Sequence, residues 1–406
     1  MNTNSKVSYR WVLLGVSVLA MLFAGIIYAW SILKAPLVDA FGWQPQQLSL
    51  NFTLTMCFFC IGGFLGSVAV RKIGVKVATL VAAVLAGSGM SLTGVLTGNN
   101  VVFLYLTYAV MAGLGIGVTY NVIVSAVSRW FPDKKGLCIG CLMMGFGASS
   151  LLLGNAADAL FRSSLGFRGT YIVLGVALFS VLFVTSLFLK EPDAAVCLPA
   201  PKIKEGNSAE TFERKDYSTK EMLSRFTFWR AFVLFAFAAA VGNSVISFAR
   251  DLAIAVGAAE TLATTLVGVL AVCNGLGRII TGALFDTLGR KKTMLIVTLL
   301  TMAAAGVTLL SVVTSSLLIC VIGLCLIGLS YGSCSTMSSS FTAIFYGQKH
   351  FSSNFSVMTC HLIGASFIAT ACGALQNAFG GYTESFLLLL GLAVLAFSLN
   401  LSIKRP

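Results

Sequence analysis

The chain has 406 residues, of which 57% are hydrophobic and only 10% are charged, and its mean hydropathy is +0.92. The core of one soluble domain cannot bury this much apolar surface, so the composition excludes a soluble globular protein and indicates a membrane protein. The net charge of +13 raises the alternative of a nucleic-acid partner, which depends on how that charge is distributed.

A membrane-spanning helix needs about 20 mostly apolar residues. Dividing the chain at its charged and Pro/Gly-rich clusters predicts twelve such spans. In chain order they are 11–35, 47–70, 77–98, 101–126, 137–158, 168–189, 227–249, 262–284, 293–312, 316–344, 354–378 and 383–403. A signal peptide is the competing interpretation of the first, but the run is long and has no clear small-residue cleavage site.

One long polar segment, residues 191–226, separates six spans from six. Its proline, serine and mixed charges suit a cytoplasmic linker with one short surface helix toward its end. We therefore predict an all-α membrane protein with a six-helix half at 1–190, the linker at 191–226 and a second six-helix half at 227–406.

The positive charge is spread over alternate loops. If the N-terminus is cytoplasmic, 22 of the 27 lysines and arginines fall on the inner side. This asymmetry predicts a multi-pass protein of the cell membrane, with both termini in the cytoplasm. The basic residues thus report topology and attraction to anionic lipid, and we expect no nucleic-acid partner.

Eleven cysteines include the spacings "CFFC" at Cys57–Cys60 and "CIGC" at Cys138–Cys141. Both lie in apolar spans without a neighbouring histidine or carboxylate, so we expect no metal and no cofactor. The chain also lacks a triad or paired carboxylates, so we expect no catalytic residues and no enzyme activity.

The two halves share a loop pattern. "RKIGVK" at Arg71–Lys76 follows the second span and "DTLGRKK" at Asp286–Lys292 follows the eighth, as duplicated transporter halves would show. "GALFDTLGRKK" resembles the loop signature of the major facilitator superfamily. The resemblance implies the major facilitator fold and a conformational role for Gly282, Asp286, Gly289 and Arg290. The first copy departs from it, because an arginine stands where the aspartate is expected.

A narrower resemblance covers most of the chain. "YAWSILKAPLVDAFGW" at Tyr28–Trp43, "RWFPDKKG" at Arg129–Gly136 and "CNGLGR" at Cys273–Arg278 are similar to the oxalate/formate antiporter branch. That branch and the related monocarboxylate transporters move small organic anions. They place an arginine on helix 8 in the central cavity, and the position of Arg278 matches it.

Arg278 also stands out on physical grounds. At 1.5 Å per residue it lies about 12 Å from the inner end of its helix, where an arginine costs about 2.5–3.5 kcal/mol on insertion scales. All fourteen acidic residues fall in loops, the linker or helix ends. The missing counter-ion is then a substrate carboxylate, which a guanidinium binds bidentately. Snorkelling or a structural pairing with a backbone carbonyl remains the alternative.

His361 is the second ionisable residue predicted to lie within the membrane, about 10 Å into helix 11. It is a candidate donor to the substrate or proton carrier, because histidine changes charge most readily near neutral pH. A hydrogen-bonded packing role is the alternative. Oxalate-type members carry a lysine in this part of helix 11, and here Leu362 falls on it. A monocarboxylate is therefore at least as favoured as oxalate.

Polar residues complete the predicted site. Tyr28, Tyr120 and Tyr331 match tyrosines that line the cavity in the resembling transporters, although each could also bond a neighbouring helix. Asn274 lies one turn before Arg278 and could orient the guanidinium or touch substrate. Lys34, near the outer end of helix 1, is interpreted as a snorkelling lysine, with anion attraction as the alternative.

The function predicted is secondary active transport of small carboxylates, such as lactate, pyruvate, formate or oxalate, by alternating access. Exchange of anions and symport with protons are both open, and a non-carboxylate solute is the alternative substrate. We expect the bilayer, the substrate and protons as partners, and a monomer as the working unit. An intramembrane enzyme or a sensor would need chemistry or a soluble domain that the sequence does not show.

Overall fold

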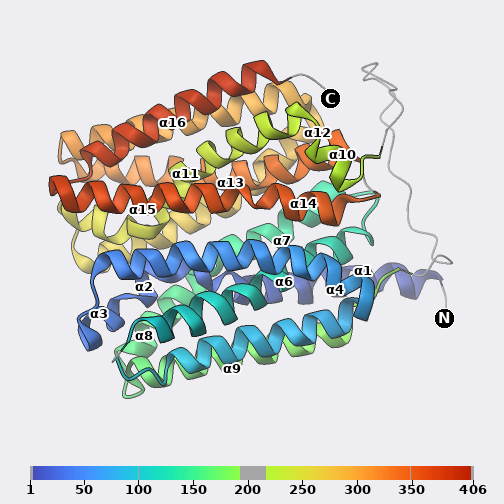
Figure 1. The fold of residues 1–406 in the computed structure, drawn as a ribbon, viewed down its shortest axis with the longest axis horizontal. Coiled ribbons are helices and arrows are strands. Elements are labelled where there is room, and N and C mark those ends of the chain that lie inside the picture. The colour runs from blue at the N-terminus through green and yellow to red at the C-terminus, as the bar shows by residue number, and fades with distance from the viewer. Residues whose placement is uncertain (1–2, 99, 193–215, 348, 404–406) are drawn as a thin grey trace.

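The structure is a computed structural model that describes residues 3–98, 100–192, 216–347 and 349–403, and every element within those residues is a helix (Figure 1). The first half contains the elements α1 (Thr3–Ala24), η1 (Gly25–Ala29), α2 (Trp30–Leu33), α3 (Ala35–Phe41), α4 (Pro45–Thr93), α5 (Val102–Leu104), η2 (Tyr105–Ala112), α6 (Gly113–Ser128), α7 (Lys135–Ser149), η3 (Ser150–Gly154), α8 (Asn155–Phe161) and α9 (Gly166–Phe188).

The second half repeats this succession of long apolar helices. Its elements are α10 (Thr219–Leu223), α11 (Phe226–Ala255), α12 (Glu260–Val313), α13 (Leu317–Tyr346), α14 (Phe351–Thr359), α15 (His361–Phe379) and α16 (Thr383–Ser402). The short helix expected at the end of the linker is α10, which begins at a capping box of Ser218 and Glu221. The rest of the predicted linker, 193–215, lies outside the described residues.

Eleven helices in the described part of the chain are long and apolar enough to cross a membrane. One of them, Gln46–Thr93, has 48 residues, which at 1.5 Å per residue is more than twice the thickness of a bilayer core. It contains the predicted span 47–70 and most of the predicted span 77–98, which extends five residues beyond its end. Figure 1 shows the chain reversing between them, so the eleven helices accommodate the twelve predicted spans.

The long helix α12 is interrupted in the same way as α4, and each interruption occurs at a glycine. Gly74 has φ 77° and ψ 166°, and Gly289 has φ 71° and ψ 177°. Only glycine adopts this region readily. At either residue a Cβ atom would meet nothing within 4 Å, so backbone conformation rather than space requires glycine. The loop pattern shared by the two halves therefore encodes the same turn twice.

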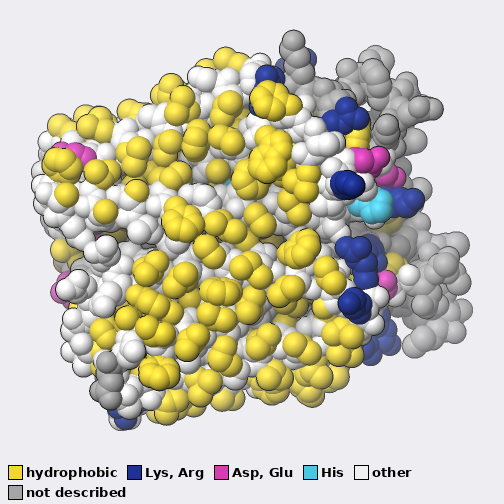
Figure 2. All heavy atoms as spheres, in the orientation of Figure 1, with side chains coloured by type: hydrophobic (Ala, Val, Ile, Leu, Met, Phe, Trp, Pro, Cys, Tyr) yellow, Lys and Arg dark blue, Asp and Glu magenta, His cyan; other side chains and the backbone are white. Residues whose placement is uncertain are grey.

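The surface divides into an apolar belt and one basic end. Both termini lie at the same end of the bundle (Figure 1), and Figure 2 shows lysine and arginine side chains gathered there, while hydrophobic side chains cover the flank. Large apolar residues on this belt are more than half exposed, among them Val176, Leu187 and Leu318. Such a surface is stable only against lipid.

Polar contacts join the halves at both ends of the bundle. At the end opposite the termini, Lys34 Nζ lies 3.3 Å from Asp251 Oδ2, and Thr53 Oγ1 lies 2.6 Å from Thr370 Oγ1. The interpretation of Lys34 as a snorkelling lysine was wrong, because a carboxylate on α11 lies within reach. At the basic end, Asn121 Nδ2 donates to Ser356 Oγ at 2.7 Å.

Replacing Gly289 with alanine should destabilise the protein by about 1–3 kcal/mol, because a Cβ atom strains this backbone conformation. Gly306→Ala is the matched control: it lies in the same helix, its Cβ would also meet nothing within 4 Å, and alanine favours helix. Thermal unfolding in detergent measures both. Equal melting temperatures for the two variants would contradict the conformational explanation.

Candidate functional site

Arg278 lies on α12 and is buried, with 1% of its surface exposed. Its Nε donates to Oδ1 of Asn274, one helical turn earlier, at 3.0 Å. Its Nη1 is buried without a hydrogen-bond partner. No carboxylate in the described part of the chain lies within 4.0 Å of the guanidinium. One amide thus holds the guanidinium in place, and part of its hydrogen-bonding capacity is unused.

A glycine on the opposite half lies beside this side chain. A Cβ at Gly147 of α7 would lie 3.6 Å from both Arg278 Nε and Asn274 Cγ. On the other side, a Cβ at Gly332 of α13 would lie 1.9 Å from the carbonyl oxygen of Asn274, so α13 packs directly on the α12 backbone. The arginine is therefore held between α7 and α13.

Two of the predicted tyrosines meet across the halves. The hydroxyls of Tyr28 and Tyr331 are 3.1 Å apart, and their rings pack edge to face with centroids 5.9 Å apart. A phenolic hydroxyl can both donate and accept a hydrogen bond, so these two groups have a donor to offer an anion.

Tyr120 belongs to the same aromatic group. Its hydroxyl contacts Met143 Sδ at 3.5 Å, and its ring packs on Phe146 with a centroid distance of 5.2 Å. Phe146 in turn packs on Tyr28 at 5.1 Å. The structure thus brings together five of the six predicted binding residues, namely Tyr28, Tyr120, Asn274, Arg278 and Tyr331.

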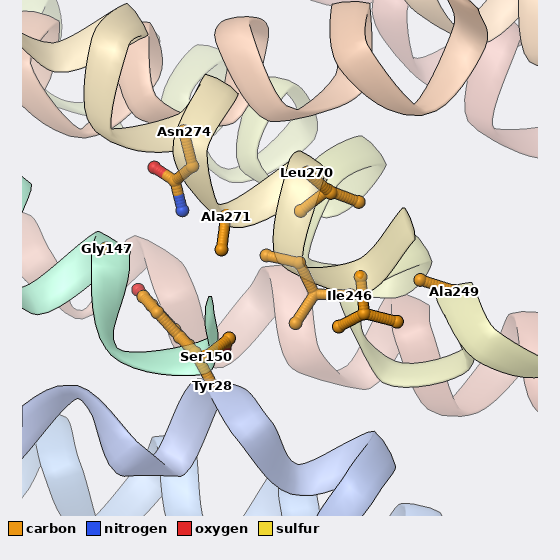
Figure 3. A pocket seen from close by; sticks show the side chains of 9 residues that line it. Tyr28, Gly147, Ser150, Ile246, Ala249, Leu270, Ala271 and Asn274 are labelled. Atoms are coloured by element: carbon orange, nitrogen blue, oxygen red, sulfur yellow. The ribbon is translucent and has the colours of Figure 1, made fainter. Parts of the chain in front are cut away.

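A small cavity lies beside this group, at the boundary of the two halves. Its volume is about 10 Å³, enough for the centre of one water molecule. Figure 3 shows the Tyr28 hydroxyl and the Asn274 amide pointing into the same space. The wall contains Gly147, Ser150, Asn274 and Tyr28 on its polar side and Ile246, Ala249, Val267, Leu270 and Ala271 on its apolar side. The centre of the molecule is closed in this conformation.

Irregular backbone surrounds the cavity. Tyr28 lies in η1, a 3-10 segment, and Ser150 begins η3, a π segment. On α11, Phe248 has φ −133° between the lining residues Ile246 and Ala249. Within a membrane, broken helices are tolerated where they line a cavity or are buried in protein, and they mark functional positions.

His361 lies elsewhere. It begins α15 after a break at Cys360, and its Nδ1 lies 2.7 Å from the carbonyl oxygen of Met358. Its ring packs against Phe235 and Phe232, with centroids 5.9 and 6.4 Å away. It does not line the cavity beside Asn274. Its role as a donor to the substrate or as a proton carrier stays a prediction.

The residues of the predicted loop motif lie along one stretch of α12. Gly282 is buried and Gly289 makes the turn. The Arg290 guanidinium stacks over the Phe345 ring at 4.8 Å, a cation–π contact that joins α12 to α13. The side chain of Asp286 is outside the described atoms. No group of three or more metal-ligating side chains occurs among the residues described.

Sequence reasoning missed much of the cavity wall. Gly145 and Gly147 form the motif "GFG", and small residues in a span favour close helix contact, which is the signal that could have placed Gly147 beside the arginine. Ser150, Ile246 and Ala249 carried no signal, because small and apolar residues in a membrane span are equally typical of packing.

Two six-helix bundles that enclose a small central cavity beside a buried arginine are the architecture of a membrane transporter. The family model of the Major Facilitator Superfamily matches residues 12–253 and 232–406. The chain belongs to this superfamily. It is a multi-pass membrane transporter and not an enzyme.

Relatives and solved structures agree with this assignment. The chain is 26% identical over 354 residues to the uncharacterized MFS-type transporter YhjX of Escherichia coli, covering 86% of this chain and 84% of that protein. It is 28% identical over 297 residues to the oxalate:formate antiporter of Oxalobacter formigenes, covering 71% of this chain and 66% of the antiporter, just under two thirds.

Shorter matches include monocarboxylate transporter 9 of Rattus norvegicus, 24% identical over 52% of this chain and 44% of that protein. Among solved structures, the proton:xylose symporter XylE superimposes with a TM-score of 0.72 at 14% identity, covering 98% of this chain and 96% of that chain. At this identity the likeness shows the fold alone.

Asn274→Ala should destabilise the protein, because it removes the acceptor of a buried guanidinium, a loss of about 1–3 kcal/mol. Asn274→Asp keeps an acceptor and adds a counter-charge, so it should melt no lower than the wild type. Thermal unfolding in detergent measures both variants. An alanine variant as stable as the wild type would show that Asn274 does not support Arg278.

Proposed function

We propose that this transporter moves small organic carboxylate anions by alternating access. One observation carries the proposal: the guanidinium of Arg278 is buried beside a closed central cavity, with Nη1 unpaired and no carboxylate nearby. A buried charge without a counter-ion is costly, and a carboxylate substrate removes that cost by binding two guanidinium nitrogens at once.

The rest of the site fits such an anion. The hydroxyls of Tyr28 and Tyr331 can donate to the carboxylate that Arg278 binds. The apolar wall formed by residues such as Leu270 and Ala271 suits the substituent of a monocarboxylate. A dicarboxylate such as oxalate carries two negative charges, and its second charge would need a second cation in the site. His361 is the candidate for that cation, but its ring packs against phenylalanines.

Two relatives support the same substrate class. One is an oxalate:formate antiporter and the other a monocarboxylate transporter. Lactate, pyruvate and formate each carry one carboxylate, so transport assays are needed to identify the particular acid. A non-carboxylate solute is the second candidate, favoured by the bond between Arg278 and Asn274, which can be a structural arrangement.

Transport requires the halves to rock about the cavity, because the cavity is too small for an organic acid in this conformation. We infer that the basic end, which carries both termini, faces the cytoplasm of a cell membrane, since positively charged loops remain inside.

The unpaired charge of Arg278 also bears on the mode of coupling. When no anion is bound, the change from one open conformation to the other leaves this buried cation without a counter-ion. The empty protein therefore reorients at a higher free-energy cost than the loaded protein, which favours exchange of one anion for another. If His361 carries a proton, it lies outside the cavity and acts on the anion indirectly, and symport with protons remains the alternative.

Arg278→Gln should reduce uptake of labelled lactate, pyruvate, formate or oxalate into proteoliposomes by about 100-fold or more, because a charge-assisted bidentate contact is lost. Arg278→Lys keeps the charge without the planar fork and should retain part of the activity. A glutamine variant that transports as well as the wild type would return Arg278 to a structural role.

Uptake into proteoliposomes loaded with anion, without a pH gradient, is compared with uptake into empty proteoliposomes under a pH gradient. We expect the loaded vesicles to be active and His361→Gln to keep that activity, because His361 does not line the cavity. Uptake driven by the gradient alone and abolished by His361→Gln would instead assign symport and make His361 the proton carrier.

A further inference from the structure

A second and much larger hollow lies at the basic end of the bundle. Its volume is about 820 Å³, and residues of both halves line it. From the first half these include Ser67, Arg71, Asn121, Ser125 and Arg129, and from the second half Lys349, His350, Ser352 and Ser353. The hollow shares none of its lining residues with the central cavity.

The lining has an excess of positive charge. Arg71, Arg129 and Lys349 contribute three cations, and His350 adds a fourth basic group. Glu191 is the one carboxylate among the lining residues the structure describes, and it is paired with Arg129 at 2.9 Å. Low-dielectric walls lined by one sign of charge concentrate the field and attract counter-ions.

Arg71 contributes to this excess of positive charge at a position where the second half of the chain has an acidic residue. It lies three residues before Gly74, and Asp286 lies three residues before Gly289, the matching turn of the second half. A cation therefore stands where the other half has a carboxylate.

No carboxylate among the residues that the structure describes forms an ion pair with Arg71. Its Nη2 donates to Ser353 Oγ at 2.6 Å, and its Nε donates to the carbonyl oxygen of Ser67 at 3.3 Å. Ser353 is in the first turn of α14, where the helix dipole is positive and disfavours a cation. The nearby Asp216 accepts from the backbone N–H of Lys349 but does not line the hollow.

We propose that this hollow is a binding site for a small oxyanion, a phosphate or carboxylate group, held by Arg71 together with Lys349 and the hydroxyls of Ser352 and Ser353. The bound anion takes the place of the carboxylate that the first half lacks.

Such an anion would link the halves. Arg71 and Arg129 belong to the first half, whereas Lys349 and α14 belong to the second, and all present positive charge to one space. An anion between them turns repulsion into attraction, and so stabilises the conformation in which the basic ends touch. A soluble phosphate and the headgroup of an anionic lipid share the chemistry that the site requires.

The test is thermal unfolding of the full chain in nanodiscs of neutral phosphatidylcholine, titrated with inorganic phosphate while chloride keeps the ionic strength constant. We expect a saturable rise in melting temperature. Arg71→Gln should weaken the apparent affinity by about tenfold or more, which corresponds to the loss of one charge-assisted contact. Arg71→Asp supplies the missing carboxylate, so it should be more stable without phosphate and respond little to it.

Two controls make the result specific. Lys72→Gln removes the same charge from an exposed residue that does not line the hollow, and it should respond as the wild type does. Arg278→Gln should also keep the response, so that failure of the central site and failure of this one are distinguishable. The proposal is overturned if phosphate gives no saturable shift, or if Lys72→Gln and Arg71→Gln lose the response equally.

Nanodiscs that contain phosphatidylglycerol identify the source of the anion. If phosphatidylglycerol raises the melting temperature, phosphate then gives no further rise, and Arg71→Gln abolishes the effect of the lipid, the ligand is a headgroup. If phosphate still stabilises the protein in these discs, the ligand is a soluble oxyanion.

Discussion

The burial of one guanidinium among apolar helices is the constraint on which the centre of this protein depends. Arg278 costs free energy wherever lipid or apolar side chains surround it, and the structure offsets that cost only in part, through one amide acceptor on Asn274. Gly147 on the opposite half lies against the guanidinium and its amide partner. Nearby helices are irregular at Tyr28 and Phe248. A small cavity with a few polar groups in an apolar wall lies beside this irregular backbone.

The contacts that close this cavity are individually weak. The two halves meet through hydroxyl pairs such as Tyr28 with Tyr331 and through a partly exposed ion pair between Lys34 and Asp251. A hydrogen bond contributes about 0.5–1.5 kcal/mol net and an exposed ion pair about 0–1 kcal/mol. Within each half, by contrast, glycines bring backbones into direct contact, as Gly332 does against Asn274. Rigid halves joined by weak contacts are what rocking motion requires.

The sequence predicts the fold well because its signals are physical requirements of a membrane. Apolar length, the side preferred by basic residues and the glycine turns at Gly74 and Gly289 each have few structural solutions. It also indicated Arg278, since a charge in an apolar span stands out. The packing of the His361 ring on Phe232 and Phe235 was not predictable, because a residue's depth along a helix does not determine which neighbour its ring faces. The apolar wall around Leu270 was equally invisible, since apolar residues are expected throughout a span.

Positive charge at the basic end and positive charge at the centre act at different stages. Exposed cations at the basic end attract every small anion, and salt screens this attraction over about 8–10 Å. They therefore raise the local anion concentration without choosing among anions. Arg278 is buried, so its field is screened far less, and an anion must lose its water to reach it. Under the proposed function, selection would depend on how completely the tyrosine hydroxyls and the apolar wall replace that water, and the central cavity would be the source of specificity.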